Sequence, residues 1–499
     1  MSTKFTEYKG LDLPKVADEI LNYWEDNNIF EKSVTTREGN EPFVFFEGPP
    51  SANGLPGVHH VLARAIKDIF PRYKTMKGYQ VKRKAGWDTH GLPIELGVEK
   101  ELGITKEDIG KKISVEDYNA ACRKAVMRYT DIWNDLTQKM GYWVDMDDPY
   151  ITYEPKYMES VWWLLKQIYN KELIYKGYTI QPYSPKAGTG LSSHELNQPG
   201  TYQDVTDTTV VAQFKAIENT LPDFLQNEGT VYFIAWTTTP WTLPSNTALT
   251  VGPKIDYVLV ETFNQYTFEP IKVVLAKNLV AKQFAGKNNV QVETSEELSS
   301  YNAGDKKIPY HVIKEFVGKD LVGIKYEQLL DYCLPNDNPQ DAFRVISGDF
   351  VTTEDGTGIV HTAPTFGADD AMVSKQATPE IPPMLVLDDN DNPVPLVDLQ
   401  GKFRPELGDL AGKYVKNEYY ADGEAPEKSV DVELAIKLKT ENKAFKVEKY
   451  VHSYPNCWRT DKPILYYPLD SWFIKVTDVK DRMHELNETI NWKPESTGT

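Results

Sequence analysis

Residues 43–60 read FVFFEGPPSANGLPGVHH, and this stretch decides the fold that the sequence predicts. It opens with an apolar run, residues 43–46, of the kind that forms a buried parallel strand. Residues 48–56 then contain three prolines, two glycines and an asparagine, so the chain must turn there. From residue 58 onward apolar side chains recur at helical spacing, which predicts a helix with one buried face. The residues on this face are Val58, Leu62, Ile66, Ile69 and Phe70.

The start of this helix is a candidate phosphate site. Free N–H groups and the helix dipole favour an anion there, and small residues let a nucleotide approach the backbone. The imidazoles of His59 and His60 can donate to phosphate oxygens as charge develops in a transition state. Taken alone, two histidines at a helix start are more often solvated side chains.

In this strand, turn and helix, residues 43–60 resemble the ATP-binding signature of the class I aminoacyl-tRNA synthetases. The family pattern is Pro-x-Ala-Asn-Gly, two residues, then His, a small apolar residue, Gly and His. Here residues 57–60 read Gly-Val-His-His, so the first histidine and the glycine have exchanged places. The resemblance implies that the last histidine, together with Gly57 and His59, is catalytic. The implied ATP-binding residues are Pro50, Asn53, Gly54, Gly57, His59 and His60.

A second segment, AGWDTHGLPIE at residues 85–95, also resembles this family. By that resemblance Asp88 pairs with the α-ammonium of the amino-acid substrate, and Gly48 and Pro49 form one wall of the side-chain pocket. The chemistry alone is weaker, because an Asp in a Gly-flanked loop is equally typical of a turn or a helix cap.

The composition indicates a soluble protein with several domains. A length of 499 residues suggests about two to four domains, and 40% hydrophobic with 26% charged residues is ordinary. There is no apolar run of about 18 residues, and residues 1–5 lack the apolar core of a signal peptide, so we expect a cytoplasmic protein without a membrane partner. The three cysteines are far apart and odd in number, which argues against a disulfide framework.

The charge distribution differs between the whole chain and one segment. A net charge of -18 argues against indiscriminate nucleic-acid binding. Residues 64–84, however, carry eight Lys and Arg against one Asp, which predicts a basic patch beside the candidate ATP site. This patch is either a solvated face or, if the family resemblance holds, a contact for phosphate or the tRNA acceptor end.

The pattern of elements changes along the chain. Helical patterns occupy residues 13–30, 115–140 and 154–172. From about residue 201 to 360 they give way to short β-rich runs punctuated by Gly, Pro and Asn, which predicts an inserted β domain. The clearest runs are residues 209–214, 231–236, 257–262 and 271–275.

The β-rich block contains two segments with chemical potential. Residues 234–246, IAWTTTPWTLPSN, put four threonines at the end of a strand, where hydroxyls can bind a ribose, an ester carbonyl or a water. Residues 356–370, GTGIVHTAPTFGADD, form a Gly-framed strand that leads to a histidine and then to paired carboxylates. Taken singly, they also fit a Thr-rich edge strand and a helix N-terminus capped by Asp.

Together these segments resemble the editing domain inserted into isoleucyl-, valyl- and leucyl-tRNA synthetases. The resemblance implies that Asp370 anchors the α-ammonium of a misattached amino acid, while Thr237, Thr238, Thr239 and His361 position the ester and the attacking water. Water attack on an activated ester needs oriented hydrogen bonds rather than a Ser-His-Asp nucleophile.

Further motifs favour the isoleucyl branch, in its eukaryote-like subgroup. They are residues 48–56, 73–79, 87–91, 192–195 and 452–459. The resemblance implies ATP-dependent activation of isoleucine, transfer to tRNA(Ile) and hydrolytic editing of Val-tRNA(Ile), with ATP as substrate, Mg2+ and a monomeric state. A valyl-tRNA synthetase and a non-catalytic tRNA- or nucleotide-binding relative remain alternatives.

The implied fold is α/β, a Rossmann-type class I synthetase catalytic half with an inserted mainly-β editing domain. We expect the catalytic part in residues 1–196, the editing domain in residues 197–453 and a return segment in residues 454–499. No Lys-Met-Ser-Lys-Ser element occurs, so we expect an N-terminal fragment that edits rather than charges tRNA.

The chain also departs from relatives that carry structural zinc. The places of their Cys-x-x-Cys pairs read Ser-Pro-Lys-Ala at residues 184–187 and Cys-Trp-Arg-Thr at residues 457–460. Only one of four thiolates remains, and a closed zinc site needs about four N or S ligands. We therefore expect no zinc in this chain.

Overall fold

The computed structural model describes residues 10–498, which form two compact units. Unit 1 contains the residues up to Tyr175 together with those from Ile474 onward, and unit 2 runs from Lys176 to Phe473. Residues 1–5, on which the absence of a signal peptide was predicted, lie outside the described residues. Within residues 10–498, no helix combines the length and the apolar character that crossing a membrane requires.

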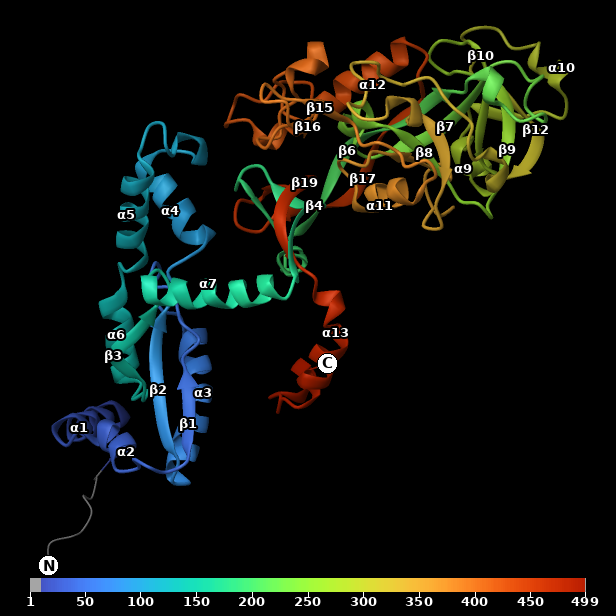
Figure 1. Cartoon of the computed structure of the whole chain (residues 1–499). Helices are drawn as coiled ribbons and strands as arrows, with labels where there is room; N and C mark the ends of the chain where they lie inside the picture. The colour runs from blue at the N-terminus through green and yellow to red at the C-terminus, as the bar shows by residue number, and fades with distance from the viewer. Residues whose placement is uncertain (1–9, 499) are drawn as a thin grey trace, which may run out of the picture. The chain divides into compact units, whose positions relative to one another are not determined.

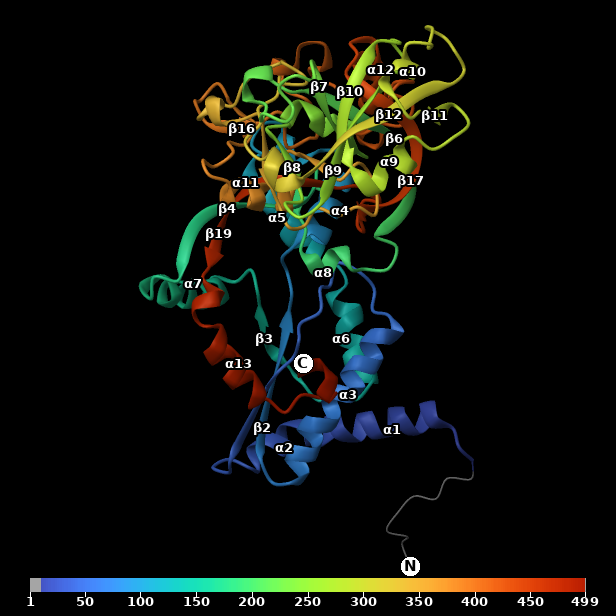
Figure 2. The ribbon, with the colours of Figure 1, turned by 90° about the vertical axis from the view of Figure 1, so that its right-hand side faces the viewer.

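The sheet of unit 1 confirms the predicted strand, turn and helix. Strands β1 (Pro42–Phe46), β2 (Gln80–Trp87) and β3 (Asp145–Ile151) pair in that order, and all are parallel. Helix α3 (Val58–Met76) joins β1 to β2 and lies alongside them in both views (Figures 1 and 2). The turn after β1 and the end of β2 therefore meet at one edge of a parallel sheet, where open α/β sheets bind ligands.

The predicted buried face of α3 is wrong. Leu62 and Ile66 are 62% and 52% exposed, whereas Arg64 and Thr75 are buried. The helix packs through its polar side, where the Arg64 guanidinium lies 4.9 Å from the ring centre of Trp133. Strand β1 likewise alternates between exposed and half-buried residues, because its successive side chains point to opposite faces of the sheet. Helical spacing thus identified the element and its apolar face, but no described element covers that face.

The helices of unit 1 follow the predicted pattern with two breaks. The prediction for residues 154–172 is confirmed by α7, but the helix predicted over residues 13–30 ends at Asp26, and α2 begins after Asn28, whose φ is 52°. The helix predicted over residues 115–140 divides into α5 and α6. The bounds are α1 (Leu13–Asp26), α2 (Ile29–Thr35), α4 (Leu92–Leu102), α5 (Val115–Val126), α6 (Thr130–Lys139), α7 (Pro155–Asn170) and α13 (Lys480–Glu488).

Unit 2 is mainly β, and all four predicted runs are strands. They correspond to β6 (Tyr202–Lys215), β7 (Val231–Thr237), β9 (Asp256–Phe263) and β10 (Pro270–Ala276). The other strands of its large sheet are β8 (Ala248–Val251), β11 (Asn289–Gln291), β12 (Ile308–Val317), β13 (Arg344–Ser347), β14 (Ile359–Thr362), β17 (Ala444–Cys457) and β18 (Lys462–Pro463). Smaller sheets contain β4 (Ile174–Ser184) with β5 (Thr189–Gly190) and β19 (Leu465–Ile474), and β15 (Leu385–Leu387) with β16 (Pro393–Pro395).

Strand β7 occupies the centre of the large sheet. It pairs antiparallel with β6 on one side. On the other side it pairs in parallel first with β10 and then, at Trp236, with Val360 of β14. The end of β7 and the strand that carries His361 are therefore neighbours, although about 120 residues separate them in the sequence.

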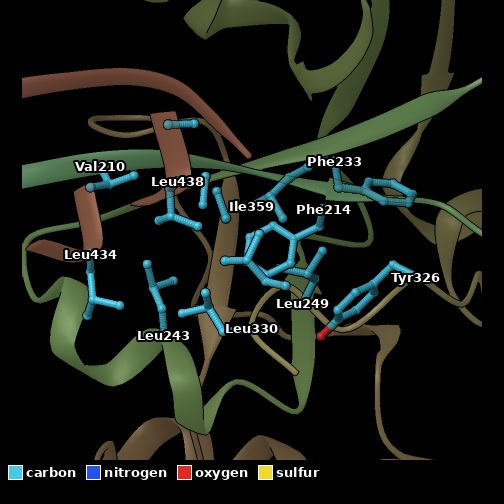
Figure 3. Close-up of a cluster of buried hydrophobic side chains, with 14 of the residues drawn as sticks. Val210, Phe214, Phe233, Leu243, Leu249, Tyr326, Leu330, Ile359, Leu434 and Leu438 are labelled. Carbon is cyan, nitrogen blue, oxygen red and sulfur yellow. The ribbon is translucent and has the colours of Figure 1, made fainter. Parts of the chain in front are cut away.

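A hydrophobic core supports these strand ends. Figure 3 shows Val210, Phe214 and Phe233 of β6 and β7 packed with Leu434 and Leu438 of α12 (Val430–Thr440). All five side chains are almost completely buried. Burial of one such apolar side chain stabilises the fold by about 1.5–3 kcal/mol, so the strand ends rest on a rigid base. Helices α8 (Ser193–Leu196), α9 (Val280–Gln283), α10 (Ser295–Leu298) and α11 (Ala368–Gln376) complete unit 2.

Candidate functional site

In unit 1, the turn after β1 is held by helix α6 and the residue before it. The backbone N–H of Tyr129 donates to the Ala52 carbonyl at 3.0 Å, and the indole N–H of Trp133 donates to the Gly54 carbonyl at 2.9 Å. The proline- and glycine-rich sequence needs these outside partners, because it forms no regular backbone hydrogen bonds of its own. Asn53 lies half-buried between the two anchored residues.

His60 is fixed at the start of α3. The N–H of Gly57, the residue that precedes the helix, donates to Nδ1 of His60 at 2.9 Å. The neutral ring therefore carries its proton on Nε2, where it is a donor. The ring also packs edge-on against Trp133, with 4.8 Å between centroids. Burial, the neighbouring His59 and Arg64 lower the pKa of His60 below its ordinary value of 6.5.

Gly57 and His59 are sterically linked. A Cβ atom added to Gly57 would lie 2.8 Å from Cε1 and 2.9 Å from Nδ1 of His59, which is closer than real Cβ contacts come. The His59 ring therefore occupies the space that a side chain at position 57 needs. The rings of His59 and His60 lie 3.8 Å apart between centroids. Two imidazoles thus lie together at the helix start.

The residues predicted to bind the amino acid lie at the neighbouring ends of β1 and β2. The Asp88 N–H donates to the Pro50 carbonyl at 2.9 Å, which joins the two strand ends. Asp88 and Gly48 are exposed, and Pro49 is half-buried. The Asp88 carboxylate accepts a long bond, 3.4 Å, from the His90 N–H. This bond is typical of a turn and leaves the carboxylate accessible.

Part of the positive charge in the predicted basic patch, residues 64–84, is buried or paired. Arg64 and Arg83 are only 6% and 3% exposed. Lys67 and Lys84 form ion pairs with Glu47 and with an aspartate of β3. These four of the eight cations are buried or paired, whereas Lys77 and Lys82 are exposed, so a phosphate contact at this segment stays a prediction. Counting charges along the sequence could not reveal partners that come from other elements.

In unit 2, the threonine segment begins where β7 ends. The Thr237 hydroxyl accepts from the Thr239 N–H at 3.1 Å, which turns the chain sharply. A buried 3-10 turn, η3 (Pro240–Ser245), follows. Thr238 and Thr239 are half-buried at the turn. Their hydroxyls and backbone groups stand at a strand end, where they can contact a ligand.

His361 is linked to this turn by hydrogen bonds on both sides of its ring. Its Nδ1 lies 2.9 Å from the Asn246 amide nitrogen, and its Nε2 lies 3.0 Å from the Thr242 hydroxyl. The Thr242 hydroxyl in turn donates to the Thr239 carbonyl at 2.8 Å. Burial lowers the pKa of His361 to about 4, so the ring is neutral at physiological pH. His361 is therefore connected to the turn through the Thr242 hydroxyl.

Asp370 lies in the first turn of α11. Its Oδ2 accepts from the Ala363 N–H at 2.8 Å, which ties the helix to the end of β14. Burial raises the pKa of Asp370 to about 6, and the bond from Ala363 opposes this shift. The rings of Trp241 and Phe366 pack edge to face at 5.1 Å, which joins η3 to the same turn. The structure thus brings the two predicted segments together.

Sequence reasoning missed the roles of Thr242 and Asn246. Both side chains are buried, and both bond the His361 ring. The signal in the sequence was that both residues stand among apolar and proline residues, which indicates burial. A buried polar side chain needs a hydrogen-bond partner. The partner itself lies 119 and 115 positions away.

Comparison with known proteins identifies the family. Residues 19–499 match the family described as tRNA synthetases class I (I, L, M and V). The chain belongs to the class I tRNA synthetases. Its Rossmann-type parallel strands and its mainly-β unit are thus parts of a class I synthetase fold.

The relatives of this class I synthetase chain include isoleucine–tRNA ligases. That of Bacteroides fragilis is 62% identical over 515 residues, covering 100% of this chain and 44% of the relative. That of Cytophaga hutchinsonii is 62% identical over 507 residues, covering 99% and 44%. That of Clostridium tetani is 43% identical over 496 residues, covering 99% and 42%. The chain spans less than half the length of these relatives.

Two further features bear on ligands of this class I synthetase chain. Within residues 10–498, no group of three or more His, Cys, Asp or Glu side chains is placed to hold a metal ion. A cavity of about 580 Å3 adjoins α11 in unit 2, and Thr365, Ala371 and Ser374 are among its lining residues. It lies beside the helix of Asp370 rather than at the threonine turn.

Proposed function

We propose that this chain takes part in the ATP-dependent activation of isoleucine and its transfer to tRNA(Ile). The observation that carries this proposal is the 62% identity to isoleucine–tRNA ligases along the entire chain. A valyl-tRNA synthetase stays the alternative, since the family description covers I, L, M and V. The partners under this proposal are isoleucine, ATP and tRNA(Ile), with Mg2+ arriving on the ATP phosphates rather than at a protein site of its own.

In this proposal, unit 1 contributes part of the activation site, at the ends of β1 and β2 and the start of α3. Gly54 and Gly57 leave room for ATP to approach the helix start, and the Nε2–H of His60 and the ring of His59 donate to its phosphates. Pro50 and Asn53 shape the ATP site. Asp88 pairs with the substrate ammonium, and Gly48 and Pro49 line the side-chain pocket. The contact of Asp88 with the turn after β1 supports this assignment.

Exchange of pyrophosphate into ATP tests the proposed activation. A protein of the relatives' full length that contains this chain is assayed with isoleucine and, in parallel, with valine. We expect rapid exchange with isoleucine and slower exchange with valine. Exchange that favours valine would establish the valyl alternative, and no exchange with either amino acid would favour a non-catalytic relative.

The swapped positions of glycine and histidine at residues 57 and 59 lead to a second expectation for the same site. Because both imidazoles stay together at the helix start, adenylate formation is preserved. Inhibitors that pack against a glycine at position 59 bind less tightly, since the His59 ring now fills that space. Inhibition measured for the protein and for the His59→Gly, Gly57→His double variant checks this expectation.

We further propose that unit 2 hydrolyses Val-tRNA(Ile). Asp370 holds the α-ammonium of the amino acid, since its Oδ1 has no partner among residues 10–498. Thr237, Thr238 and Thr239 bind the ester and orient the water, and His361 positions this turn. The ester is already activated, so oriented hydrogen bonds are sufficient for water attack.

A second site of this kind has an energetic reason. For isoleucyl enzymes themselves, discrimination of isoleucine from valine by one methylene is known to be worth only about 1–3 kcal/mol. A hydrolytic site that admits valine and excludes isoleucine removes the remaining errors.

Finer assignments form part of the same proposal. The protein belongs to the eukaryote-like subgroup of isoleucyl enzymes, is cytoplasmic and acts as a monomer. The catalytic part occupies residues 1–196, the editing domain residues 197–453 and the return segment residues 454–499. The contrast between a parallel sheet in unit 1 and a mainly-β unit 2 supports this division.

A further inference from the structure

Tyr326 has a buried hydroxyl that reaches the network around His361. The residue lies between the 3-10 turns η5 (Gly318–Leu321) and η6 (Pro339–Asp341), and its ring packs edge to face against Phe214 at 5.4 Å. Only 1% of the residue is exposed. Figure 3 shows Tyr326 among the apolar side chains of the core. Of the side chains labelled there, only that of Tyr326 carries an oxygen atom. That hydroxyl donates to Oδ1 of Asn246 at 2.6 Å.

The Asn246 amide has one orientation that satisfies all its neighbours. Its nitrogen lies 2.8 Å from the Ala248 carbonyl, which can only accept a hydrogen bond. The same nitrogen lies 2.9 Å from Nδ1 of His361. Its oxygen faces the Tyr326 hydroxyl, which donates to it. A rotated amide would point its oxygen at the Ala248 carbonyl and leave two acceptors facing each other.

This orientation decides which nitrogen of His361 carries the proton. A neutral imidazole has one donor and one acceptor. Because Asn246 donates to Nδ1, the proton sits on Nε2 and is donated to the Thr242 hydroxyl. Thr242 is then free to donate to the Thr239 carbonyl. Every donor from Tyr326 to the threonine turn points the same way.

We propose that Tyr326 is a positioning residue for the hydrolytic reaction: its hydroxyl orients Asn246, selects the Nε2–H tautomer of His361 and thereby fixes the Thr237–Thr239 turn. The reacting groups stay those of the proposed hydrolysis, on which this inference rests. The residue works at a distance, since its hydroxyl contacts Asn246 and not the turn itself.

Without the hydroxyl, Oδ1 of Asn246 has no donor within residues 10–498. A buried acceptor without a donor is unfavourable, so the amide samples orientations that give its oxygen a partner. His361 Nδ1 can supply a proton if the ring changes tautomer. Nε2 then becomes an acceptor, Thr242 donates to it, and the bond from Thr242 to the turn is lost.

The test uses Tyr326→Phe, which removes one oxygen and keeps the ring that packs in the core. Nitrogen NMR of the 15N-histidine-labelled chain reports the tautomer, with His361→Gln identifying the signal. We expect His361 to be entirely in the Nε2–H form in the unchanged chain. In Tyr326→Phe we expect the Nδ1–H form to appear. If the variant keeps only the Nε2–H form, the inference is overturned.

Hydrolysis kinetics on Val-tRNA(Ile) provide the second readout. We expect Tyr326→Phe to lower kcat about tenfold with KM unchanged, because a misplaced turn slows the reaction without removing a binding contact. The control is Tyr419→Phe, since Tyr419 is also buried in unit 2 and donates to the Pro463 carbonyl at 2.9 Å. Its kcat should stay within about twofold.

The two failures are distinguishable. If the unchanged chain does not hydrolyse Val-tRNA(Ile), the proposed function fails. If the unchanged chain hydrolyses it and Tyr326→Phe is as active as Tyr419→Phe, the proposed function stands and the positioning role of Tyr326 is wrong. Melting temperatures of both variants report whether lost folding accounts for lost activity.

Discussion

Gly57 and His59 depend on each other because they share one volume at the start of α3. A side chain at position 57 would meet the His59 ring at 2.8 Å. The steric constraint involves both residues, because it arises between a side chain at position 57 and the ring at position 59. A side chain at position 57 thus fits only if the His59 ring moves, so the two positions constrain each other.

A double-mutant cycle tests this coupling. Gly57→Ala forces the His59 ring away, and we expect it to destabilise unit 1 by about 0.5–1 kcal/mol in the unchanged chain. In the His59→Ala background the same substitution should cost less, because the ring is absent. Urea unfolding of the four chains gives the coupling free energy. Equal costs in both backgrounds would show that the two positions are independent.

The pH dependence of stability tests the burial of His361. Its pKa is about 4 when folded and 6.5 ordinarily, so between these values only the unfolded chain binds the proton and stability falls as pH falls. Going from pH 7 to pH 5, this linkage costs about 2 kcal/mol. His361→Gln removes it. The free energy of unfolding of the variant, relative to the unchanged chain, should therefore rise by about 2 kcal/mol over that interval.

Asp370 provides the control, because its contribution to stability changes with pH in the opposite direction. Its pKa is raised to about 6 from 3.8, so the folded chain binds the proton first and stability rises as pH falls through 6. Asp370→Asn should thus lose stability relative to the unchanged chain from pH 7 to pH 5, by about 1 kcal/mol. Urea unfolding at the two pH values measures both variants. Shifts of the same sign for both would contradict the account.

At the scale of elements, α12 holds the threonine segment from the core side. Asp431 in its first turn accepts from the Trp241 N–H at 2.9 Å, and the Lys416 ammonium lies 3.9 Å from the same carboxylate. Lys416 also bonds Asp207 of β6 at 3.0 Å. Asp431 and Lys416 are almost fully buried. This buried network connects the helix, the sheet and η3.

Replacing Asp431 should therefore lower the free energy of unfolding. Asp431→Ala leaves the Trp241 N–H without an acceptor and Lys416 with one carboxylate fewer, and we expect a loss of about 3 kcal/mol. The matched control is Glu441→Ala at the other end of α12, where the pair with Lys437 is partly exposed; it should cost less than about 1 kcal/mol. Urea unfolding of unit 2 compares them. Similar costs would contradict a structural role for the buried carboxylate.

The apolar face of α3 gives a second prediction at this scale. Ile66 is 52% exposed and Ile94 of α4 is 5% exposed. In this chain Ile66→Gln should change the stability of unit 1 by less than about 0.5 kcal/mol. Ile94→Ala should cost about 2–5 kcal/mol because it leaves a cavity. Thermal unfolding measures both variants, and a large loss for Ile66→Gln would mean that the face is covered.

These elements also show what sequence can and cannot predict. The alternation and spacing of apolar residues located β6, β7, β9 and β10 and the start of α3, because those patterns arise within each element. The exposure of α3 depends on which other elements are present. The pairing of Asn246 and Thr242 with His361 depends on β7 and β14 being neighbours, which no local pattern records.

At the scale of the molecule, the chain combines a parallel α/β unit with a mainly-β unit that is encoded within it. The first carries Gly57, His59 and His60 at the start of α3, beside the end of the parallel sheet, and the second carries the threonine turn, His361 and Asp370. The central claim is that unit 2 removes valine from mischarged tRNA. Family membership establishes the fold, whereas this activity depends on the geometry of those residues.

The most direct measurement is the rate at which the 499-residue chain deacylates Val-tRNA(Ile) and Ile-tRNA(Ile). We expect Val-tRNA(Ile) to be hydrolysed at least about tenfold faster than Ile-tRNA(Ile), and the hydrolysis to be lost in Asp370→Ala. Deacylation of Val-tRNA(Ile) no faster than in buffer, by a chain whose unfolding shows it to be folded, would contradict the account.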